Sequence, residues 1–396
     1  MFDSHGSADV SIALGLDFAE IRNVVQTICA KYPGEYWRDL EDRREYPDAF
    51  VAEMTEAGLL AALVPARYGG SGLPLRAGCV ILEEIHAAGC DAYACHAQMY
   101  MMNMLVRHGN EAQKETYLPG IASGSIRFQA FGVTEPTSGS DTLNLRTRAE
   151  RDGDDFVING QKIWTSRALK SDLMTLLCRT TPADRCAKRT DGLSVILIDM
   201  REGQRNGMSI RPIDAMVNHH ACEVFFDNLR VPAANLIGEQ DKGFRYILTG
   251  MNAERILVTS ESLGDCRYFL RRATEYAGER TIFGKPIGQN QGVQFPLARA
   301  YAEWKAADSL ARSAAALFEA GESCGEEANI AKLLASEAAW NAAEAAMQTF
   351  GGFSAAREYD IERKWKDARL ARIAPISTNL ILAYIGQHVL GLPKSY

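Results

Sequence analysis

The sequence predicts a multidomain α+β protein in which an N-terminal helical domain, a small β domain and a C-terminal helical bundle follow one another. Two changes of pattern support this prediction. Helical periodicity dominates up to about residue 125, short β-rich segments follow, and helical periodicity returns from Gly243. A chain of 396 residues is also too long for one compact core. We therefore expect domains at 1–125, 126–236 and 237–396.

The N-terminal domain is predicted to be helical because proline and glycine mark the ends of apolar segments with helical periodicity. Pro47 suits the first turn of a helix that Gly58 can end. A longer helix is expected from about Leu75 into a Met-rich segment. The methionines there indicate either an adaptable apolar wall for a ligand or a plain helix core. They are Met99, Met101, Met102 and Met104.

The middle domain is predicted to be a small sandwich or barrel. Its apolar segments are short, rich in β-branched and aromatic residues, and separated by turn residues. Turns are expected at Arg151–Asp154 and at Asn159-Gly160. The four clearest strands are Asp155–Asn159, Leu173–Cys178, Leu193–Ile198 and Cys222–Phe226.

The C-terminal domain is predicted to be a helical bundle, because its alanine-rich segments have sustained helical periodicity and short links. The expected helices are Phe244–Ala277, Gln289–Ala320, Glu326–Phe350 and a last one near Thr378–Leu390.

Composition narrows the classes of function. The formal net charge of −7 argues against a nucleic-acid-binding groove. No apolar run reaches the roughly 20 residues of a membrane-spanning helix, and the N-terminal segment lacks the features of a secretory signal. Nine cysteines without a C-x-x-C pair predict reduced, mostly buried thiols and a cytoplasmic protein. His219-His220 lacks a third ligand at suitable spacing, so we assign no metal site.

Two motifs in the middle domain carry the clearest functional signal. Phe131–Asp141 reads F-G-V-T-E-P-T-S-G-S-D, and Asn159–Ser166 reads N-G-Q-K-I-W-T-S. The first resembles the T-E-P-x-x-G-S-D signature of the acyl-CoA dehydrogenase family, and the second resembles that family's N-G-x-K-x-W motif. The resemblance continues in the same order over nearly the whole chain. The further segments are Arg280–Ile287 with Gln291, then Gln348–Gly352, then Arg363–Arg369.

The resemblance implies an FAD-dependent enzyme that removes two hydrogens from an acyl-CoA thioester. It also implies a homotetramer that passes its electrons to an electron-transfer flavoprotein. In the family, the T-E-P segment lines the flavin and the thioester. That role would put Phe131, Val133, Thr134 and Ser140 at the cofactor, with Ser140 also beside the CoA arm. Short hydroxyl side chains and the adjacent glycine suit close contact with a ligand.

Further cofactor residues follow from the same resemblance. Trp164 would stack near the flavin ring, and Ser166, in place of the usual threonine, would hydrogen-bond flavin N5. Ser377 and Asn379 keep a hydroxyl and an amide near the flavin. An arginine that can bind phosphate with two N–H groups, and paired glycines, suit the dinucleotide. In the family, residues from a neighbouring subunit hold the FAD pyrophosphate and adenosine. The positions that resemble them here are Arg280, Phe283, Gln291, Gln348, Gly351 and Gly352.

The catalytic base does not stand where medium- and short-chain family members have it. Pro375 occupies that glutamate's position. The segment around Glu254 resembles isovaleryl-CoA and long-chain acyl-CoA dehydrogenases, whose base is the glutamate before an arginine. We therefore expect Glu254 as general base, with Asn252 and Arg255 beside the substrate. Burial should raise the pKa of Glu254, and pairing with Arg255 should lower it.

Pro375 also lacks the backbone N–H that binds the thioester carbonyl in the family. Loss of one such donor typically costs about 3 kcal/mol of transition-state stabilisation. Three explanations stay open: Ile376 N–H donates instead, another group polarises the carbonyl, or the reaction is not α,β-dehydrogenation.

Rival interpretations keep the fold and change the chemistry. A flavin-dependent oxidase or monooxygenase, or a dehydrogenase of acyl-carrier-protein thioesters, would accommodate Pro375. A non-catalytic binding protein, such as a DNA-associated relative, is disfavoured by the net charge of −7.

Overall fold

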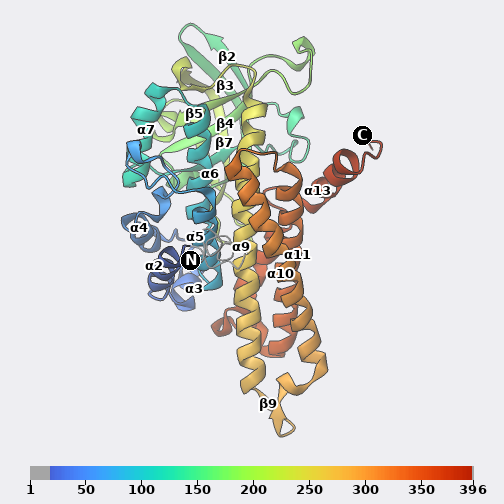
Figure 1. The fold of residues 1–396 in the computed structure, drawn as a ribbon. Helices are drawn as coiled ribbons and strands as arrows, with labels where there is room; N and C mark the ends of the chain where they lie inside the picture. The colour runs from blue at the N-terminus through green and yellow to red at the C-terminus, as the bar shows by residue number, and fades with distance from the viewer. Residues whose placement is uncertain (1–17, 395–396) are drawn as a thin grey trace, which may run out of the picture. The chain divides into compact units, whose positions relative to one another are not determined.

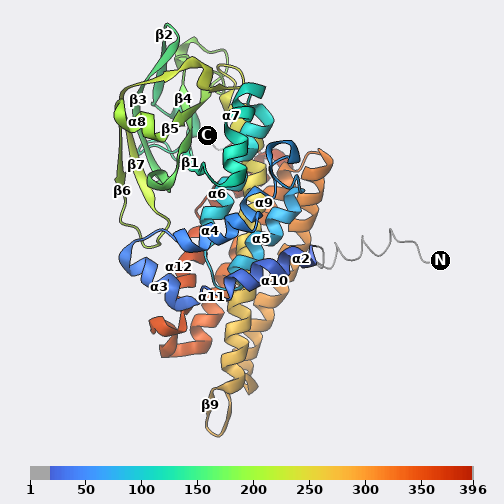
Figure 2. The same cartoon turned by 90° about the vertical axis from the view of Figure 1, so that its left-hand side faces the viewer.

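The computed structural model describes residues 18–394 as parts of two compact units (Figures 1 and 2). The first unit contains residues 18–39, 74–92 and 252–394, and the second contains residues 40–73 and 93–251. The segment in which we expect no secretory signal lies outside the described residues.

An eight-stranded sheet forms most of the second unit. Its strand order is β6-β7-β3-β2-β4-β5-β8, and β1 pairs in parallel with β4. All four predicted strands form, and β3 and β7 extend further than expected because they pair with each other along most of their length. The strands are β1 (Phe128–Gly132), β2 (Arg148–Asp152), β3 (Asp155–Ser166), β4 (Leu173–Arg179), β5 (Leu193–Asp199), β6 (Met208–Pro212), β7 (Ala221–Pro232) and β8 (Leu236–Ile237).

The sheet folds as two halves around one apolar core. β2 and β4 share the single residue pair Arg148 and Arg179. Buried side chains from both sides of this junction belong to one cluster, among them Phe156 on β3, Val224 on β7 and Ile196 on β5. Two packed layers of this kind agree with the predicted sandwich.

The turn predicted at Asn159-Gly160 is wrong, because both residues lie within β3. The pairing of β3 with β7 shifts register between Ile158 and Gly160. Gly160 has φ +149°, and a Cβ there would lie 2.6 Å from the Cα of Thr147. The glycine therefore marks a bulge and a close backbone approach rather than the end of a strand. The turn predicted at Arg151–Asp154 does form, between β2 and β3.

Most helices of the second unit precede the sheet in the chain, and one short helix lies between β5 and β6. Pro47 precedes α4, and Gly58 follows it with φ +74°, which confirms that predicted helix. The four methionines of the Met-rich segment are buried in α6 and at most 2% exposed, which favours the helix-core alternative. The helices are α4 (Asp48–Glu56), α6 (Tyr93–His108), α7 (Glu111–Ser123) and α8 (Met200–Arg205).

Long helices that run side by side form the first unit (Figure 1). Buried residues of α9, α10, α11 and α12 share an alanine-rich core that contains Phe269 and Phe350. The three long predicted helices are confirmed to within two residues at each end. The helices are α2 (Ala19–Cys29), α3 (Gly34–Arg43), α5 (Leu75–Ala87), α9 (Gly243–Glu279), α10 (Gln291–Ala320), α11 (Gly325–Phe350), α12 (Ile361–Ala371) and α13 (Thr378–Tyr384); α3 and α9 continue across the unit boundary.

The single helix predicted from Leu75 into the Met-rich segment is wrong. The chain instead forms α5 and α6, with Gly89 between them at φ +87°. A Cβ at Gly89 would lie 2.7 Å from the ring of Tyr268. Tight packing against that ring and the left-handed backbone both require glycine, and they end the helix.

Candidate functional site

The T-E-P motif forms a tight turn directly after β1. The N–H of Glu135 donates to the carbonyl of Ser138, and the N–H of Ser138 donates to the carbonyl of Glu135, both over 3.1 Å. The turn leaves Gly139 and Ser140 exposed and Thr134 half-buried. Phe131 lies just before the turn, with its ring centroid 5.8 Å from that of Tyr100.

A buried ion pair between Lys162 and Glu135 stabilises this turn. The ammonium of Lys162 donates to Glu135 Oε1 over 2.8 Å and to the carbonyl of Val133 over 3.0 Å. Glu135 also accepts the backbone N–H groups of Arg146 and Thr147, over 2.6 and 2.9 Å. Burial raises the pKa of Glu135, but the charge of Lys162 and these hydrogen bonds hold it below its usual range. The pair therefore fixes the backbone that carries Thr134.

The end of β3 lies beside the T-E-P segment. The N–H of Ile163 donates to the carbonyl of Thr134 over 2.9 Å. The next residue, Trp164, has φ +60° and is 55% exposed, and the pairing with β7 shifts register there. Ser166 follows at the last pair of the strand, opposite Ala221. The structure thus places Trp164, an exposed indole on a strained backbone, directly after the residue that binds Thr134, and Ser166 lies two residues further along β3.

The first unit holds the predicted base. Glu254 lies on α9 and is 6% exposed. Burial raises the pKa of its carboxyl to about 7, although the charge of Arg255 lowers it, and Glu261 adds a smaller rise. Arg255 donates through Nη1 to Oδ1 of Asn252 over 2.8 Å. Both predicted directions for the pKa of Glu254 are confirmed: burial raises it and the charge of Arg255 lowers it.

Pro375 lies in the link between α12 and α13. Ser377 is the N-cap of α13, and its hydroxyl accepts the N–H of Leu380 over 3.4 Å. Asn379 is exposed in the first turn of that helix. The hydroxyl of Ser377 therefore has a structural role within the chain, which the sequence did not predict.

The predicted dinucleotide residues gather at two neighbouring ends of the bundle helices. Arg280 follows α9, and its guanidinium lies 5.5 Å from the ring centroid of Phe353. Phe353 belongs to the segment that begins with Gly351-Gly352 at the end of α11. Phe283 is 98% exposed at the tip of the β9–β10 hairpin (Thr281–Ile282 and Lys285–Pro286). The two predicted glutamines, at the start of α10 and in the last turn of α11, are exposed: Gln291 and Gln348.

Two glycines in these segments are not required by the chain's own geometry. A Cβ at Gly139 or Gly352 would meet no atom within 4 Å, and neither residue has a left-handed φ. Gly351 differs, since its φ of +58° favours glycine. Open space above a glycine backbone suits the close approach of a ligand.

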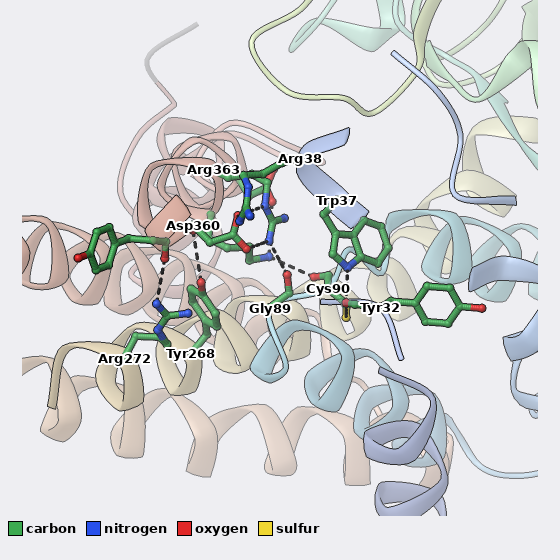
Figure 3. Close-up of polar contacts among 12 residues, drawn as sticks. Tyr32, Trp37, Arg38, Gly89, Cys90, Tyr268, Arg272, Asp360 and Arg363 are labelled. Carbon is green, nitrogen blue, oxygen red and sulfur yellow. Dashed lines mark hydrogen bonds and ion pairs between the residues drawn. The ribbon is translucent and has the colours of Figure 1, made fainter. Parts of the chain in front are cut away.

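The Arg363–Arg369 motif has a structural role (Figure 3). The guanidinium of Arg363 donates to both carboxylate oxygens of Asp360, over 2.9 and 2.8 Å, and to the carbonyl of Gly89 over 2.7 Å. The next residue, Lys364, lies 2.8 Å from the carboxylate of Asp265 on α9. These buried contacts join α12 to α9 and to the segment after α5, and so they fix the helix that precedes Pro375.

Within residues 18–394, no group of three or more His, Cys, Asp or Glu side chains could hold a metal ion. The ring of His219 contacts that of Tyr93, with centroids 3.6 Å apart, and the ring of His220 lies 5.8 Å from that of Tyr46. None of the described helices is both long enough and apolar enough to cross a membrane.

Family models match most of the chain. The N-terminal domain of acyl-CoA dehydrogenases matches residues 17–125, the middle domain matches 130–229, and the C-terminal domain matches 241–390. The acyl-CoA dehydrogenase fadE12 of Mycobacterium bovis is 34% identical over 381 residues, which cover 95% of this chain and 96% of that relative.

Solved structures agree in fold. The glutaryl-coenzyme A dehydrogenase in its glutaryl-CoA complex is 28% identical, with a TM-score of 0.87 and coverage of 95% of this chain and 96% of that one. The prolyl acyl carrier protein oxidase AnaB is 25% identical, with a TM-score of 0.88 and coverage of 94% and 98%. Sequence and fold agree over the same residues. The chain therefore belongs to the acyl-CoA dehydrogenase family of FAD-dependent oxidoreductases.

Proposed function

We propose that this enzyme introduces a double bond between the α and β carbons of an acyl-CoA thioester, with Glu254 as the general base. FAD, when bound, would supply N5 as the acceptor of the β-hydride. The α C–H bond breaks as the carboxylate of Glu254 takes the proton. The observation that carries the proposal is the burial of Glu254, which raises its pKa to about 7. A carboxylate with that pKa is basic enough for the abstraction and is still largely ionised above neutral pH.

The proposal is tested by replacing the base alone. Glu254→Gln should lower the rate of anaerobic flavin reduction by an acyl-CoA by at least about 100-fold, within the range typical of general-base catalysis. FAD content should stay unchanged. Glu275→Gln is the matched control, because Glu275 lies on the same helix with its side chain 55% exposed. Flavin reduction by Glu254→Gln at the control's rate would contradict the assignment.

Ser140, Asn252 and Arg255 are proposed to contact the acyl thioester. Arg255 is 7% exposed and holds Asn252 through one hydrogen bond. Its Nε is buried without a hydrogen-bond partner among the described residues. A buried guanidinium N–H without an acceptor is costly, so an acceptor from a bound ligand would stabilise it. Arg255→Lys should weaken acyl-CoA binding, which calorimetric titration of the FAD-loaded enzyme would measure.

The residues of the two sequence motifs and of the bundle ends fit FAD. Trp164 offers an exposed indole, and Gly139 and Gly352 leave open space where a bound group could lie against the backbone. Gly352→Val should therefore lower FAD content without lowering the thermal stability of the FAD-free protein. The full proposed set is Phe131, Val133, Thr134, Ser140, Trp164, Ser166, Arg280, Phe283, Gln291, Gln348, Gly351, Gly352, Ser377 and Asn379.

A homotetramer in which a neighbouring subunit contributes to the FAD site is also proposed. Large apolar side chains are exposed at the β9–β10 hairpin and at the start of α10: Ile282 is 44%, Phe283 98% and Phe295 60% exposed. A second copy that covers them would remove this apolar surface from water. Light scattering should give the mass of four chains for the native protein, and Phe283→Asp should give a smaller species.

We propose an electron-transfer flavoprotein as the electron acceptor and the cytoplasm as the compartment. Support for the compartment comes from the nine cysteines, seven of which are buried and none of which forms a disulfide in the described residues. Turnover with acyl-CoA that depends on added electron-transfer flavoprotein would support the acceptor, and cell fractionation would test the compartment.

A second candidate, favoured by Pro375, is an oxidase or monooxygenase, or a dehydrogenase that acts on acyl-carrier-protein thioesters. The similarity to a prolyl acyl carrier protein oxidase shows that the fold hosts such chemistry in another protein. Rapid oxygen consumption by the substrate-reduced enzyme would favour an oxidase over a dehydrogenase. Flavin reduction by a carrier-protein thioester but by no acyl-CoA would identify the carrier.

A further inference from the structure

Lys332 on α11 anchors the segment that contains Pro375. Its ammonium donates to the carbonyl of Ala371 over 2.7 Å and to the carbonyl of Ile376 over 2.9 Å. These two carbonyls stand on either side of Pro375 in the chain. The side chain thus joins the end of α12 and the start of α13 to one point on a bundle helix.

The environment of Lys332 is unusual for a lysine. It is 1% exposed, and the hydrogen bonds of its ammonium go to two backbone carbonyls rather than to a carboxylate of the described residues. Burial, together with the charges of Arg255 and Arg372, lowers the pKa of its ammonium to about 8, although the charge of Glu337 raises it. Lysine is almost never fully buried without a counter-charge, because losing water costs several kcal/mol. A buried cation that binds two backbone carbonyls indicates that the positions of those two peptide groups are important to the protein.

The peptide groups after Pro375 offer donors. The N–H groups of Ile376 and Ser377 have no acceptor within the part of the chain that the structure describes. The N–H of Ser377 belongs to the same peptide group as the carbonyl of Ile376, which accepts the hydrogen bond from Lys332. A hydrogen bond from an ammonium to a carbonyl polarises the peptide group, so its N–H becomes a stronger donor.

These donors belong to the same region of the first unit as the proposed base. Arg255, the residue after Glu254, is close enough to lower the pKa of Lys332 by its charge. The same Arg255 lowers the pKa of Glu254. The base and the ammonium that holds the peptide group are therefore both within range of the charge of Arg255.

We propose that the Ile376–Ser377 peptide group, held and polarised by Lys332, donates its N–H to the thioester oxygen in place of the amide that Pro375 lacks. This inference rests on the proposed function. As the α C–H bond breaks, the proton goes to Glu254 and the electron pair moves onto the thioester oxygen, where the Ser377 N–H stabilises the charge. Lys332 acts through the peptide group and is a positioning residue.

The test uses the FAD-loaded enzyme and 3-thiaacyl-CoA probes with short, branched and long chains. Sulfur at the β position leaves no hydride to transfer, so exchange of the α-proton with deuterated solvent reports enolate formation alone. Lys332→Met should slow this exchange by at least about tenfold with probe affinity within about threefold, since weakening one oxyanion donor costs rate rather than binding. Lys332→Arg should restore most of the rate. Lys305→Met, at a side chain that is 49% exposed on α10, is the control.

A second pair of variants removes the N–H itself. Ser377 has φ −68°, which proline also adopts, so Ser377→Pro deletes the donor without straining that residue. Ser377→Ala removes the capping hydroxyl and keeps the N–H. Ser377→Pro should exchange the α-proton about 100-fold more slowly than Ser377→Ala, as expected for one lost oxyanion donor.

The outcomes separate the two proposals. Exchange by the native enzyme, with Ser377→Pro equal to Ser377→Ala, would overturn the role of the peptide group while the proposed function stands. Exchange by Lys332→Met within threefold of the native rate would overturn the role of Lys332. No exchange of any probe by the native enzyme would overturn the proposed function, and this inference with it.

Discussion

Removing the buried ammonium of Lys162 should destabilise the second unit strongly. Lys162→Met keeps the length of the side chain and its packing but leaves Glu135 buried without its counter-charge. Loss of one partner of a buried ion pair costs about 3–5 kcal/mol. Glu135 keeps the N–H groups of Arg146 and Thr147 as partners, so the low end of that range applies. The lost hydrogen bond to Val133 adds about 1 kcal/mol, which gives about 4 kcal/mol in total.

The loss of stability in Lys162→Met should depend on pH, in a direction that follows from the pKa of Glu135. In the native protein the pKa of Glu135 lies below its usual range, so its ionised form stabilises the fold above the unfolded pKa, and this contribution is lost as pH falls. In Lys162→Met, burial without the lysine charge should raise the pKa of Glu135, so the folded state of the variant favours a proton. The difference in stability should therefore be largest near pH 8 and shrink toward pH 4.

Urea unfolding, followed by circular dichroism at pH 8 and pH 4.5, measures the difference. The double variant Lys162→Met with Glu135→Gln is the control, because glutamine carries no charge and its single carbonyl oxygen can still accept one of the two backbone N–H groups. It should recover at least half of the stability lost by Lys162→Met. A loss below about 1 kcal/mol in the single variant, or no recovery in the double variant, would refute the reasoning.

Three further predictions follow from buried or strained positions. The pKa of Glu254 rises from 4.5 to about 7 on folding, so its ionisation costs stability as pH rises through this interval. Glu254→Gln should therefore raise the free energy of unfolding by up to about 3 kcal/mol at pH 8 and by little at pH 4.5, measured by urea unfolding. Gly160→Ala should lower the free energy of unfolding by at least about 2 kcal/mol, because a Cβ there would lie 2.6 Å from the backbone of Thr147; thermal unfolding would show it, and an unchanged melting temperature would contradict it. Asp265→Asn should cost about 3 kcal/mol, because it removes the nearer of the two carboxylates beside the buried ammonium of Lys364 and leaves only Asp367, at 3.4 Å; unfolding by urea at an unchanged midpoint would count against this network.

Local patterns predicted the secondary structure where the signal is itself local. The alanine-rich segment Phe244–Ala277 became α9 with little change in its bounds, and Leu173–Cys178 became β4. Such segments carry their periodicity or β-propensity within ten residues, and packing only confirms it. Gly89 and Asn159-Gly160 were misjudged because their conformations depend on distant residues. Only the folded chain places the ring of Tyr268 against one glycine and the backbone of Thr147 against the other.

The candidate site was predicted in part. The direction of the pKa shift of Glu254 followed from the residue types and an assumption of burial. Lys162 and Lys332 gave no such signal, since a lysine in a strand or in an alanine-rich helix usually lies in water. Their partners lie 27 and 44 residues away in sequence. The backbone N–H that Pro375 lacks was the one clue in the sequence that another group must donate to the thioester carbonyl.

The most direct test of the proposed function is an anaerobic titration of the FAD-loaded protein with short, branched, medium and long acyl-CoAs, followed by the absorption of the oxidised flavin. We predict that at least one class bleaches this band, and that the rate rises with pH around a midpoint near 7 as Glu254 loses its proton. Bound FAD that no acyl-CoA bleaches at any pH would contradict the assignment of an acyl-CoA dehydrogenase activity to this chain.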